Sequence, residues 1–228
     1  MNAARILPLI ILRPEPGASA TARRAADLGL SVVKLPLFTI EPAVWRAPDP
    51  ALFDRLLLTS ANAVRHAGAE LAGLMALPCW CVGEATASAA RDAGMWVERV
   101  GDADAASLLA GSSQPCRLLW LAGEAHSATT LPSGFSVKIH TLYRAIEVAI
   151  NPEQLAGPAA VLVHSEAAAR RLAALAPERS SLTLIAISTT VARAAGDGWK
   201  AVHICNQPRD IEMVAMAAKL CHDSVQPL

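Results

Sequence analysis

Four short turns in the sequence carry polar residues where helix N-termini are expected. Each turn follows a brief apolar run and precedes an alanine-rich stretch, and the four are residues 59–62, 83–86, 164–166 and 188–190. The first N–H groups of a helix lack partners within the helix and carry a partial positive charge. With a nearby hydroxyl they can bind a carboxylate or a phosphate. The turns therefore indicate an anionic ligand.

The serines in these turns also have a structural explanation. Ser60, Ser165 and Ser188 each precede a predicted helix, where a serine side chain commonly accepts a hydrogen bond as an N-cap. For any one serine, capping is the simpler interpretation. Four anion-competent turns in one chain favour a shared binding site, and the two roles are compatible.

Tyr143 is the only tyrosine among 228 residues. A lone tyrosine is usually a packing residue whose hydroxyl finds a hydrogen-bond partner. Tyr143 lies in a tract that interrupts the rhythm of predicted elements, which would let its hydroxyl face a cleft instead. The residues alone leave both explanations open.

Charge and motif content argue against several function classes. Twenty basic residues balance twenty acidic ones, which disfavours broad electrostatic binding of DNA or RNA. The chain has no Walker A loop, no glycine-rich dinucleotide motif after the first strand and no nucleophile elbow. Its six histidines show no metal spacing, and Cys79 and Cys81 sit in an apolar run typical of a strand. The residues therefore show neither metal-ligand spacing nor a nucleotide-cofactor motif.

The expected compartment is the cytoplasm. Five cysteines form no secreted-type framework, which suggests reduced thiols. The apolar run at residues 6–12 and the sequence Ala18-Ser19-Ala20 could form a signal peptide, but the run is short and contains Pro8. No segment approaches membrane-spanning length.

Short apolar runs alternate with alanine-rich stretches, a pattern typical of βαβ units around a parallel sheet. Gly29 and Gly94 follow alanine-rich stretches, as glycines after a helix do, and Pro208 stands where the last helix would begin. Strands are predicted near residues 6–12, 31–37, 55–59, 79–82, 95–100, 117–121, 136–142, 159–164, 182–188 and 199–205.

The chain is internally duplicated. Residues 56–92 align with residues 161–197 without a gap, and ten of the 37 positions are identical. A weaker match joins residues 11–15 to residues 120–124. Each copy reads as two strands, an intervening segment and three more strands, which is enough for a doubly wound α/β sheet with helices on both faces.

Two proline-containing tracts interrupt the pattern, at residues 38–50 and 140–158. They are either loops inside two sequential lobes or crossings between lobes, in which case the two ends of the chain build one lobe together. The strand and helix pattern does not decide between these arrangements.

Taken together, several segments resemble uroporphyrinogen-III synthase over essentially the whole chain. The segments that carry the resemblance are residues 12–14, 58–64, 82–87, 142–144, 163–168, 186–192 and 198–199. Each is weak alone, but their order and spacing match the family. The resemblance favours the crossing arrangement: one lobe of residues 1–37 and 151–228, another of residues 51–138, and a two-stranded linker of residues 38–50 and 139–150.

The resemblance also implies a reaction. Enzymes of this family cyclise the linear tetrapyrrole hydroxymethylbilane, invert its last pyrrole ring and release water, without a metal or organic cofactor. The chain is accordingly expected to be a monomer that binds this small-molecule polycarboxylate, with no nucleic-acid or membrane partner.

Site residues follow position by position from the resemblance. Tyr143 matches a tyrosine suspected of assisting hydroxyl loss, and the turns around positions 60, 86, 165 and 190 are expected to face one cleft. The chain departs from many relatives at Ala122, where they have arginine, and His126 or Arg144 could replace that contact. The expected substrate-binding residues are Arg13, Ser60, Asn62, Gly83, Thr86, Gly123, Ser165, Ser188 and Thr190.

Two other functions compete with this interpretation. A non-catalytic two-lobed sensor would keep an anionic-ligand cleft, with Ala122 as a trace of lost activity. An unrelated enzyme for phosphorylated substrates would use the same helix N-termini.

Overall fold

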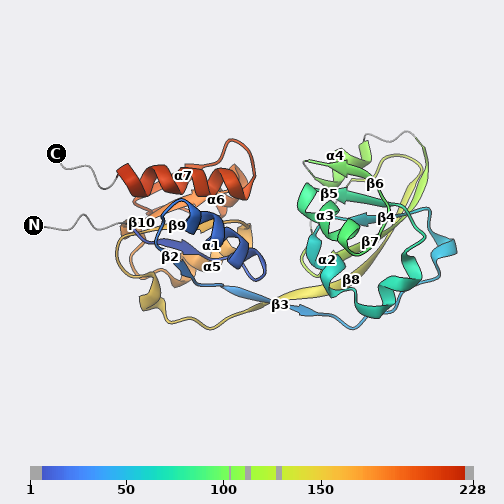
Figure 1. The fold of residues 1–228 in the computed structure, drawn as a ribbon, viewed down its shortest axis with the longest axis horizontal. Coiled ribbons are helices and arrows are strands. Elements are labelled where there is room, and N and C mark those ends of the chain that lie inside the picture. Colours follow the sequence, from blue (N-terminus) through green and yellow to red (C-terminus); the bar gives the residue numbers. More distant parts are fainter. Residues whose placement is uncertain (1–6, 103, 111–113, 127–129, 224–228) are drawn as a thin grey trace, which may run out of the picture. The chain divides into compact units, whose positions relative to one another are not determined.

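A computed structural model describes residues 7–102, 104–110, 114–126 and 130–223. The chain divides into two compact units (Figure 1). Unit 1 comprises Met1–Thr39 and Ile146–Leu228, and unit 2 comprises Ile40–Ala145. The chain therefore passes from one unit to the other twice, and strands β3 (Phe38–Pro42) and β8 (Phe135–Glu147) both contain a boundary.

Unit 1 contains a five-stranded parallel sheet in the order β11-β10-β9-β1-β2. Its strands are β1 (Leu9–Ile11), β2 (Val32–Lys34), β9 (Ala159–Val163), β10 (Leu182–Ala186) and β11 (Ala201–Ile204). Its helices are α1 (Gly17–Asp27), α5 (Glu166–Leu175), α6 (Thr189–Ala195) and α7 (Asp210–Asp223), with 3-10 turns η3 (Pro152–Leu155) and η4 (Arg179–Ser181).

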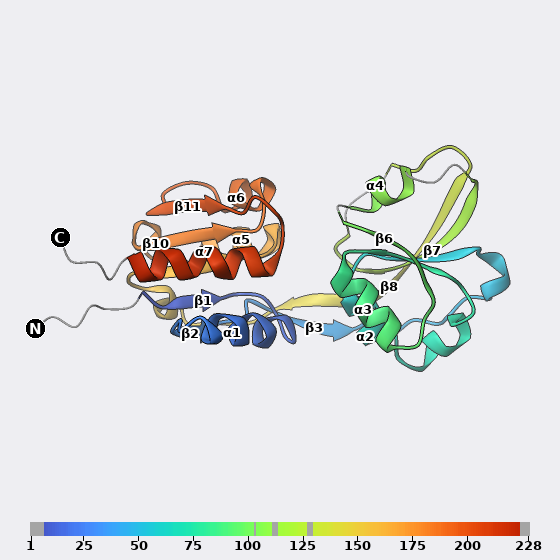
Figure 2. The same cartoon turned by 45° about the horizontal axis from the view of Figure 1, so that its top comes forward.

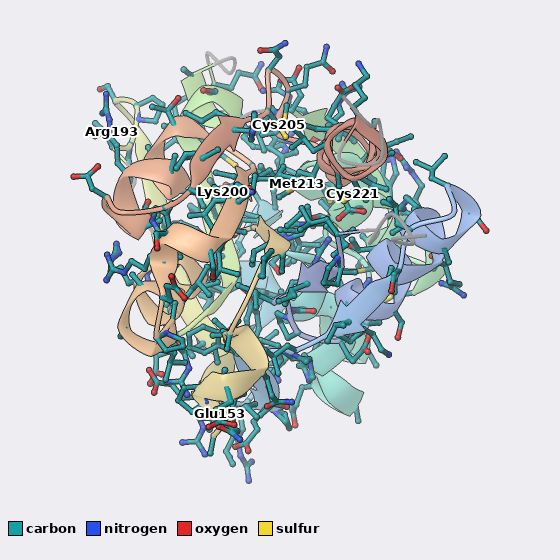
Figure 3. All side chains as sticks on the ribbon, turned by 90° about the vertical axis from the view of Figure 1, so that its left-hand side faces the viewer. Glu153, Arg193, Lys200, Cys205, Met213 and Cys221 are labelled. Carbon is teal, nitrogen blue, oxygen red and sulfur yellow. The ribbon has the colours of Figure 1, made fainter. Side chains whose placement is uncertain are left out.

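Helices cover both faces of the unit 1 sheet. Side chains alternate across each strand, so Ile10 and Val161 join a core with α5 and α6, whereas Ile11 joins a core with α1 and α7. Figure 2 shows α1 and α7 on the same side of this sheet. The second core also contains Cys205, Met213 and Cys221 (Figure 3). Burial on both faces explains why the inner strands β1 and β9 are continuously apolar.

Unit 2 is built around a six-stranded sheet in the order β3-β8-β7-β4-β5-β6. Its further strands are β4 (Arg55–Leu58), β5 (Cys79–Val82), β6 (Val97–Gly101) and β7 (Cys116–Gly123). Its helical segments are η1 (Pro50–Leu52), α2 (Ala61–His66), η2 (Gly68–Leu74), α3 (Glu84–Asp92) and α4 (Ala105–Ala110). One core layer lies against α2 and α3, and the other lies against α4. Both sheets are therefore the doubly wound α/β sheets predicted from the sequence.

The duplication is visible in the sheet topology. The order β8-β7-β4-β5-β6 in unit 2 matches β2-β1-β9-β10-β11 in unit 1. The repeated segment β4-α2-β5-α3 corresponds to β9-α5-β10-α6, and β7 corresponds to β1. The five matched strands of each sheet thus combine two strands from one sequence copy with three from the other, and β3 is an additional strand of the unit 2 sheet.

Local signals set several helix ends. Gly29 and Gly94 have φ angles of 74° and 83° and follow α1 and α3 by two residues, a left-handed conformation that favours glycine. The predicted start of the last helix is wrong by two residues: α7 begins at Asp210, so Pro208 lies before it. In the described part of the chain, no helix is long and apolar enough to cross a membrane.

Candidate active site

The predicted site residues of unit 1 lie at the carboxyl ends of its parallel strands. Arg13 follows β1, Ser165 follows β9, and Ser188 and Thr190 follow β10. Open parallel sheets bind ligands at this edge because the helix N-termini point there. Arg13 is partly exposed, and its Nη1 atom donates a hydrogen bond to Asp210 Oδ1 at 3.1 Å.

The three predicted serines are N-caps. Ser60 accepts a hydrogen bond from the Asn62 backbone N–H, Ser165 from Ala168, and Ser188 from Val191. The structural interpretation of these serines is therefore confirmed. Ser188 also exchanges a hydrogen bond of 2.9 Å with Thr190 Oγ1. The Ser165 and Thr190 side chains remain exposed at their helix termini.

Unit 2 brings its predicted residues to the carboxyl edge of its own sheet. Gly83 is the N-cap residue of α3 and has a φ of 80°, and its N–H donates to the Gly101 carbonyl at 2.6 Å. Glycine is required there by the backbone angle and not by crowding, because a Cβ on Gly83 would meet no atom within 4 Å. Thr86 lies in the first turn of α3 but is only 5% exposed, so most of its side chain packs inside unit 2. Asn62 is half-buried and accepts a hydrogen bond from Arg65.

The ring of Tyr143 lies directly against Gly123 at the end of β7. The two residues are paired in the β7–β8 ladder, where the register shifts between Ala122 and Gly123. A Cβ built on Gly123 would lie 2.6 Å from both Cε2 and Cζ of Tyr143 and 2.9 Å from its hydroxyl oxygen. The tyrosine ring thus occupies the space that any side chain at residue 123 would need. Gly123 was predicted as a substrate contact, and the structure gives it this additional role.

Two histidines surround this pair. The His66 and Tyr143 ring centroids are 6.0 Å apart, and burial together with the charge of Arg65 lowers the pKa of His66. His126 Nδ1 lies 3.1 Å from the Gly123 carbonyl oxygen. Arg144, by contrast, pairs with Glu41 at 3.3 Å. Of the two suggested replacements for the missing arginine, His126 is therefore adjacent to Gly123, and Arg144 already has a carboxylate partner.

Sequence reasoning missed several residues of this arrangement. It did not identify Asp210, the partner of Arg13, because that contact spans 197 positions. It also missed His66, although this residue ends the short helix that begins at the Ser60 turn. Among the described residues, no group of three or more His, Cys, Asp or Glu side chains could hold a metal ion.

Two doubly wound units with polar residues at the carboxyl edges of their sheets define a class of duplicated α/β ligand-binding proteins. The family model of uroporphyrinogen-III synthase HemD matches residues 19–215, and the chain belongs to this family. Its members are cyclising lyases of haem biosynthesis. No curated protein has a significantly similar sequence.

Solved structures share the fold at low sequence identity. The structure of uroporphyrinogen-III synthetase from Helicobacter pylori 26695 has a TM-score of 0.63 and 16% identity, and the match covers 94% of this chain and 99% of that one. A mutant uroporphyrinogen III synthase from the extremely thermophilic bacterium Thermus thermophilus has a TM-score of 0.54 and 18% identity, with 95% and 99% covered. The fold assignment therefore extends over nearly the whole chain.

Proposed function

We propose that this protein cyclises hydroxymethylbilane to uroporphyrinogen III, and that Tyr143 donates the proton that allows the terminal hydroxyl to leave. The observation that carries the proposal is the seating of the Tyr143 ring against Gly123 at the carboxyl end of β7. This contact fixes a phenol group at the edge where parallel sheets bind ligands. Tyr143 is also the only phenol in the chain.

The chemistry begins with loss of the terminal hydroxyl. The Tyr143 O–H transfers its proton to the hydroxyl oxygen as the carbon–oxygen bond breaks, and water leaves. The α-carbon of the last pyrrole ring that already carries the methylene bridge to the third ring attacks the resulting azafulvene-type cation. The bond from that carbon to the bridge then breaks, which leaves an azafulvene-type cation on the third ring. The free α-carbon of the last ring bonds to this second cation and loses its proton to the Tyr143 phenolate, so the last ring is inverted. One water is lost overall, and the proton count balances. Because unassisted closure proceeds without inversion, the enzyme must hold the last ring in the inverting pose and keep other water away.

The substrate carboxylates bind to polar groups at the sheet edges. In unit 1, Arg13 and the exposed turns at Ser165 and Thr190 supply donors, and in unit 2 the turns at Ser60 and Gly83 do so. Backbone N–H groups and an arginine suit carboxylates because both present donors in fixed directions. Acetate and propionate groups along the substrate match several such donors.

The mechanism requires no metal and no organic cofactor, since the proposed proton donor is a protein side chain. We further propose that the protein acts as a monomer in the cytoplasm. The five cysteines support that compartment, because all are free and buried, as thiols in a reducing environment can be. The charge balance of twenty basic and twenty acidic residues supports a small-molecule substrate rather than nucleic acid.

The test is a product assay with freshly prepared hydroxymethylbilane. The type I and type III uroporphyrinogens are separated after oxidation, and the rate of type III formation is compared with a heat-inactivated sample. We expect type III product only with the native protein. Type I product alone, formed at the uncatalysed rate, would contradict the proposal and leave a ligand-binding protein of the same fold.

A further inference from the structure

Four side chains converge on the Asp210 carboxylate at the carboxyl edge of the unit 1 sheet. Asp210 Oδ1 accepts hydrogen bonds from Thr21 Oγ1 at 2.6 Å and Arg13 Nη1 at 3.1 Å, and lies 2.8 Å from His164 Nε2. Asp210 Oδ2 accepts one from Arg24 Nη1 at 2.5 Å. These residues come from the end of β1, from α1, from the end of β9 and from the start of α7. A single carboxylate thus connects four elements.

The Asp210 carboxylate is mostly buried, and both of its oxygens accept hydrogen bonds from the protein. The Asp210 side chain is 16% exposed and the His164 side chain 9%, while Thr21 is completely buried. Burial opposes ionisation of Asp210, but the hydrogen bonds from His164 and Thr21 and the charge of Arg13 lower its pKa overall. Asp210 is therefore charged at neutral pH, and its oxygens are used by the protein itself.

The guanidinium group of Arg13 is bonded to the described part of the protein through only one of its three nitrogens. Only Nη1 bonds to Asp210 and Thr21, whereas Nε and Nη2 have no hydrogen-bond partner among the residues that the structure describes. That free edge lies beside Gly17, the first residue of α1. A Cβ on Gly17 would lie 2.5 Å from Nε and 2.9 Å from Nη2. Glycine at this position therefore leaves room for the edge.

We propose that Asp210 is a positioning residue that fixes Arg13 so that its Nε–Nη2 edge binds a substrate carboxylate in a bidentate manner. This inference rests on the proposed function, and it assigns a ligand geometry to one residue of that site. The free edge is the part of a guanidinium that matches the two oxygens of a carboxylate.

The arrangement differs from an ion pair that only stabilises the fold. An arginine that serves stability alone gains most from a two-bond fork, as Arg55 forms with Glu98 through Nε and Nη2. Arg13 instead donates to Asp210 through Nη1 alone. Burial lowers the pKa of His164, so two arginines face one aspartate and a neutral imidazole. One positive charge is left for an anion.

The test compares KM and kcat for hydroxymethylbilane across four single variants and one double variant. Arg13→Ala should raise KM by about 10- to 100-fold, as expected for lost hydrogen bonds to a charged group. Asp210→Asn should raise KM about tenfold with kcat nearly unchanged, and it should add little in the Arg13→Ala background, because coupled residues are not additive. Arg13→Lys should not bring KM back from the Arg13→Ala value to the wild-type value, because lysine lacks the planar arrangement of donors. Gly17→Ala should raise KM while Asp210 stays in place.

Matched controls separate positioning from folding. Asp54→Asn removes an exposed ion pair with Arg117, which lies at the amino end of β7, away from the carboxyl edge of the unit 2 sheet. Gly73→Ala adds a methyl group whose nearest neighbour would be 4.0 Å away. Both should leave KM unchanged. Thermal unfolding of every variant identifies any that fail to fold, and Gly17→Ala tests the geometry without touching the buried carboxylate.

The outcomes distinguish this inference from the proposed function. Absence of type III product with the wild-type protein would overturn the proposed function. An unchanged KM in Arg13→Ala would overturn the contact between Arg13 and substrate. A raised KM in Arg13→Ala, together with wild-type KM in both Asp210→Asn and Gly17→Ala, would overturn the positioning role alone.

Discussion

Substitution of Gly123 by alanine is expected to displace the proposed proton donor. The new Cβ would lie 2.6 Å from Cε2 and Cζ of Tyr143, whereas non-bonded carbons prefer about 3.5–4.0 Å. The ring must therefore move by about 1 Å or the end of β7 must shift by a similar distance. Neither strand can slide freely, because β7 and β8 are paired from Cys116 and Phe135 onward.

A displacement of that size has a large effect on the reaction and a modest effect on stability. Misplacing a catalytic group by about 1 Å can lower the rate about 100-fold, which corresponds to about 2.7 kcal/mol in the activation free energy. Overpacking by one methyl typically costs about 1–3 kcal/mol of folding free energy. We therefore expect a folded Gly123→Ala protein with kcat reduced about 100-fold and KM changed much less.

The assay measures initial rates of type III product for Gly123→Ala, Tyr143→Phe and the double variant. If the methyl acts through the tyrosine, it should reduce kcat little further once the hydroxyl is gone. Gly73→Ala serves as the control, because its methyl meets only Ala47 Cβ at 4.0 Å. A Gly123→Ala protein with wild-type kcat would refute the seating of Tyr143 as the basis of its catalytic position.

Four further predictions test other parts of the structure. Tyr143→Phe should lower kcat by about 100-fold or more with little change in KM, measured as type III product formed per second. Ser165→Ala should lower the free energy of unfolding by about 1 kcal/mol in urea titrations, because the α5 cap is lost. Hydrogen bonds from Arg55 and Trp80 help to lower the pKa of Glu98 below its ordinary value of 4.5. Above pH 4.5 the wild-type protein should therefore have a larger free energy of unfolding than Glu98→Gln, and this difference should vanish as the pH falls through the lower folded-state pKa. The five cysteines are buried with raised pKa values, so mass spectrometry should detect alkylation at about pH 7.5 only after denaturation.

Local features of the fold were predictable from the sequence because their causes are local. A serine before an alanine-rich stretch predicts a cap, and the structure has caps at Ser60, Ser165 and Ser188. Gly29 and Gly94 mark helix ends through a backbone angle that other residues avoid. The alternation of apolar runs and helices, together with the internal repeat, predicts doubly wound parallel sheets. Apart from the repeat, which relates segments 105 residues apart, each signal involves residues only a few positions apart.

The interactions inside the candidate site could not be predicted in this way. Asp210 meets Thr21 and Arg13 across 189 and 197 positions, and no periodicity connects such residues. The role of Gly123 depends on a register shift between β7 and β8, which the strand pattern does not specify. Strand β8 also extends to Glu147, beyond the predicted end at residue 142, because the tract after it pairs instead of looping. Side-chain contacts of this kind follow from tertiary packing.

The two passages of the chain between the units have a consequence for biosynthesis. Strand β1 lies between β2 and β9 in its sheet, and β9 begins at Ala159, 148 residues after β1 ends at Ile11. At ribosomal speeds of about 5–20 residues per second, β9 is synthesised on the order of 10 s after β1. All strands of unit 2 are complete by then. The inserted unit therefore leaves the ribosome complete while the wholly apolar β1 still lacks β9, one of its two neighbours in the sheet. We expect β1 to be exposed to nascent-chain chaperones during this interval.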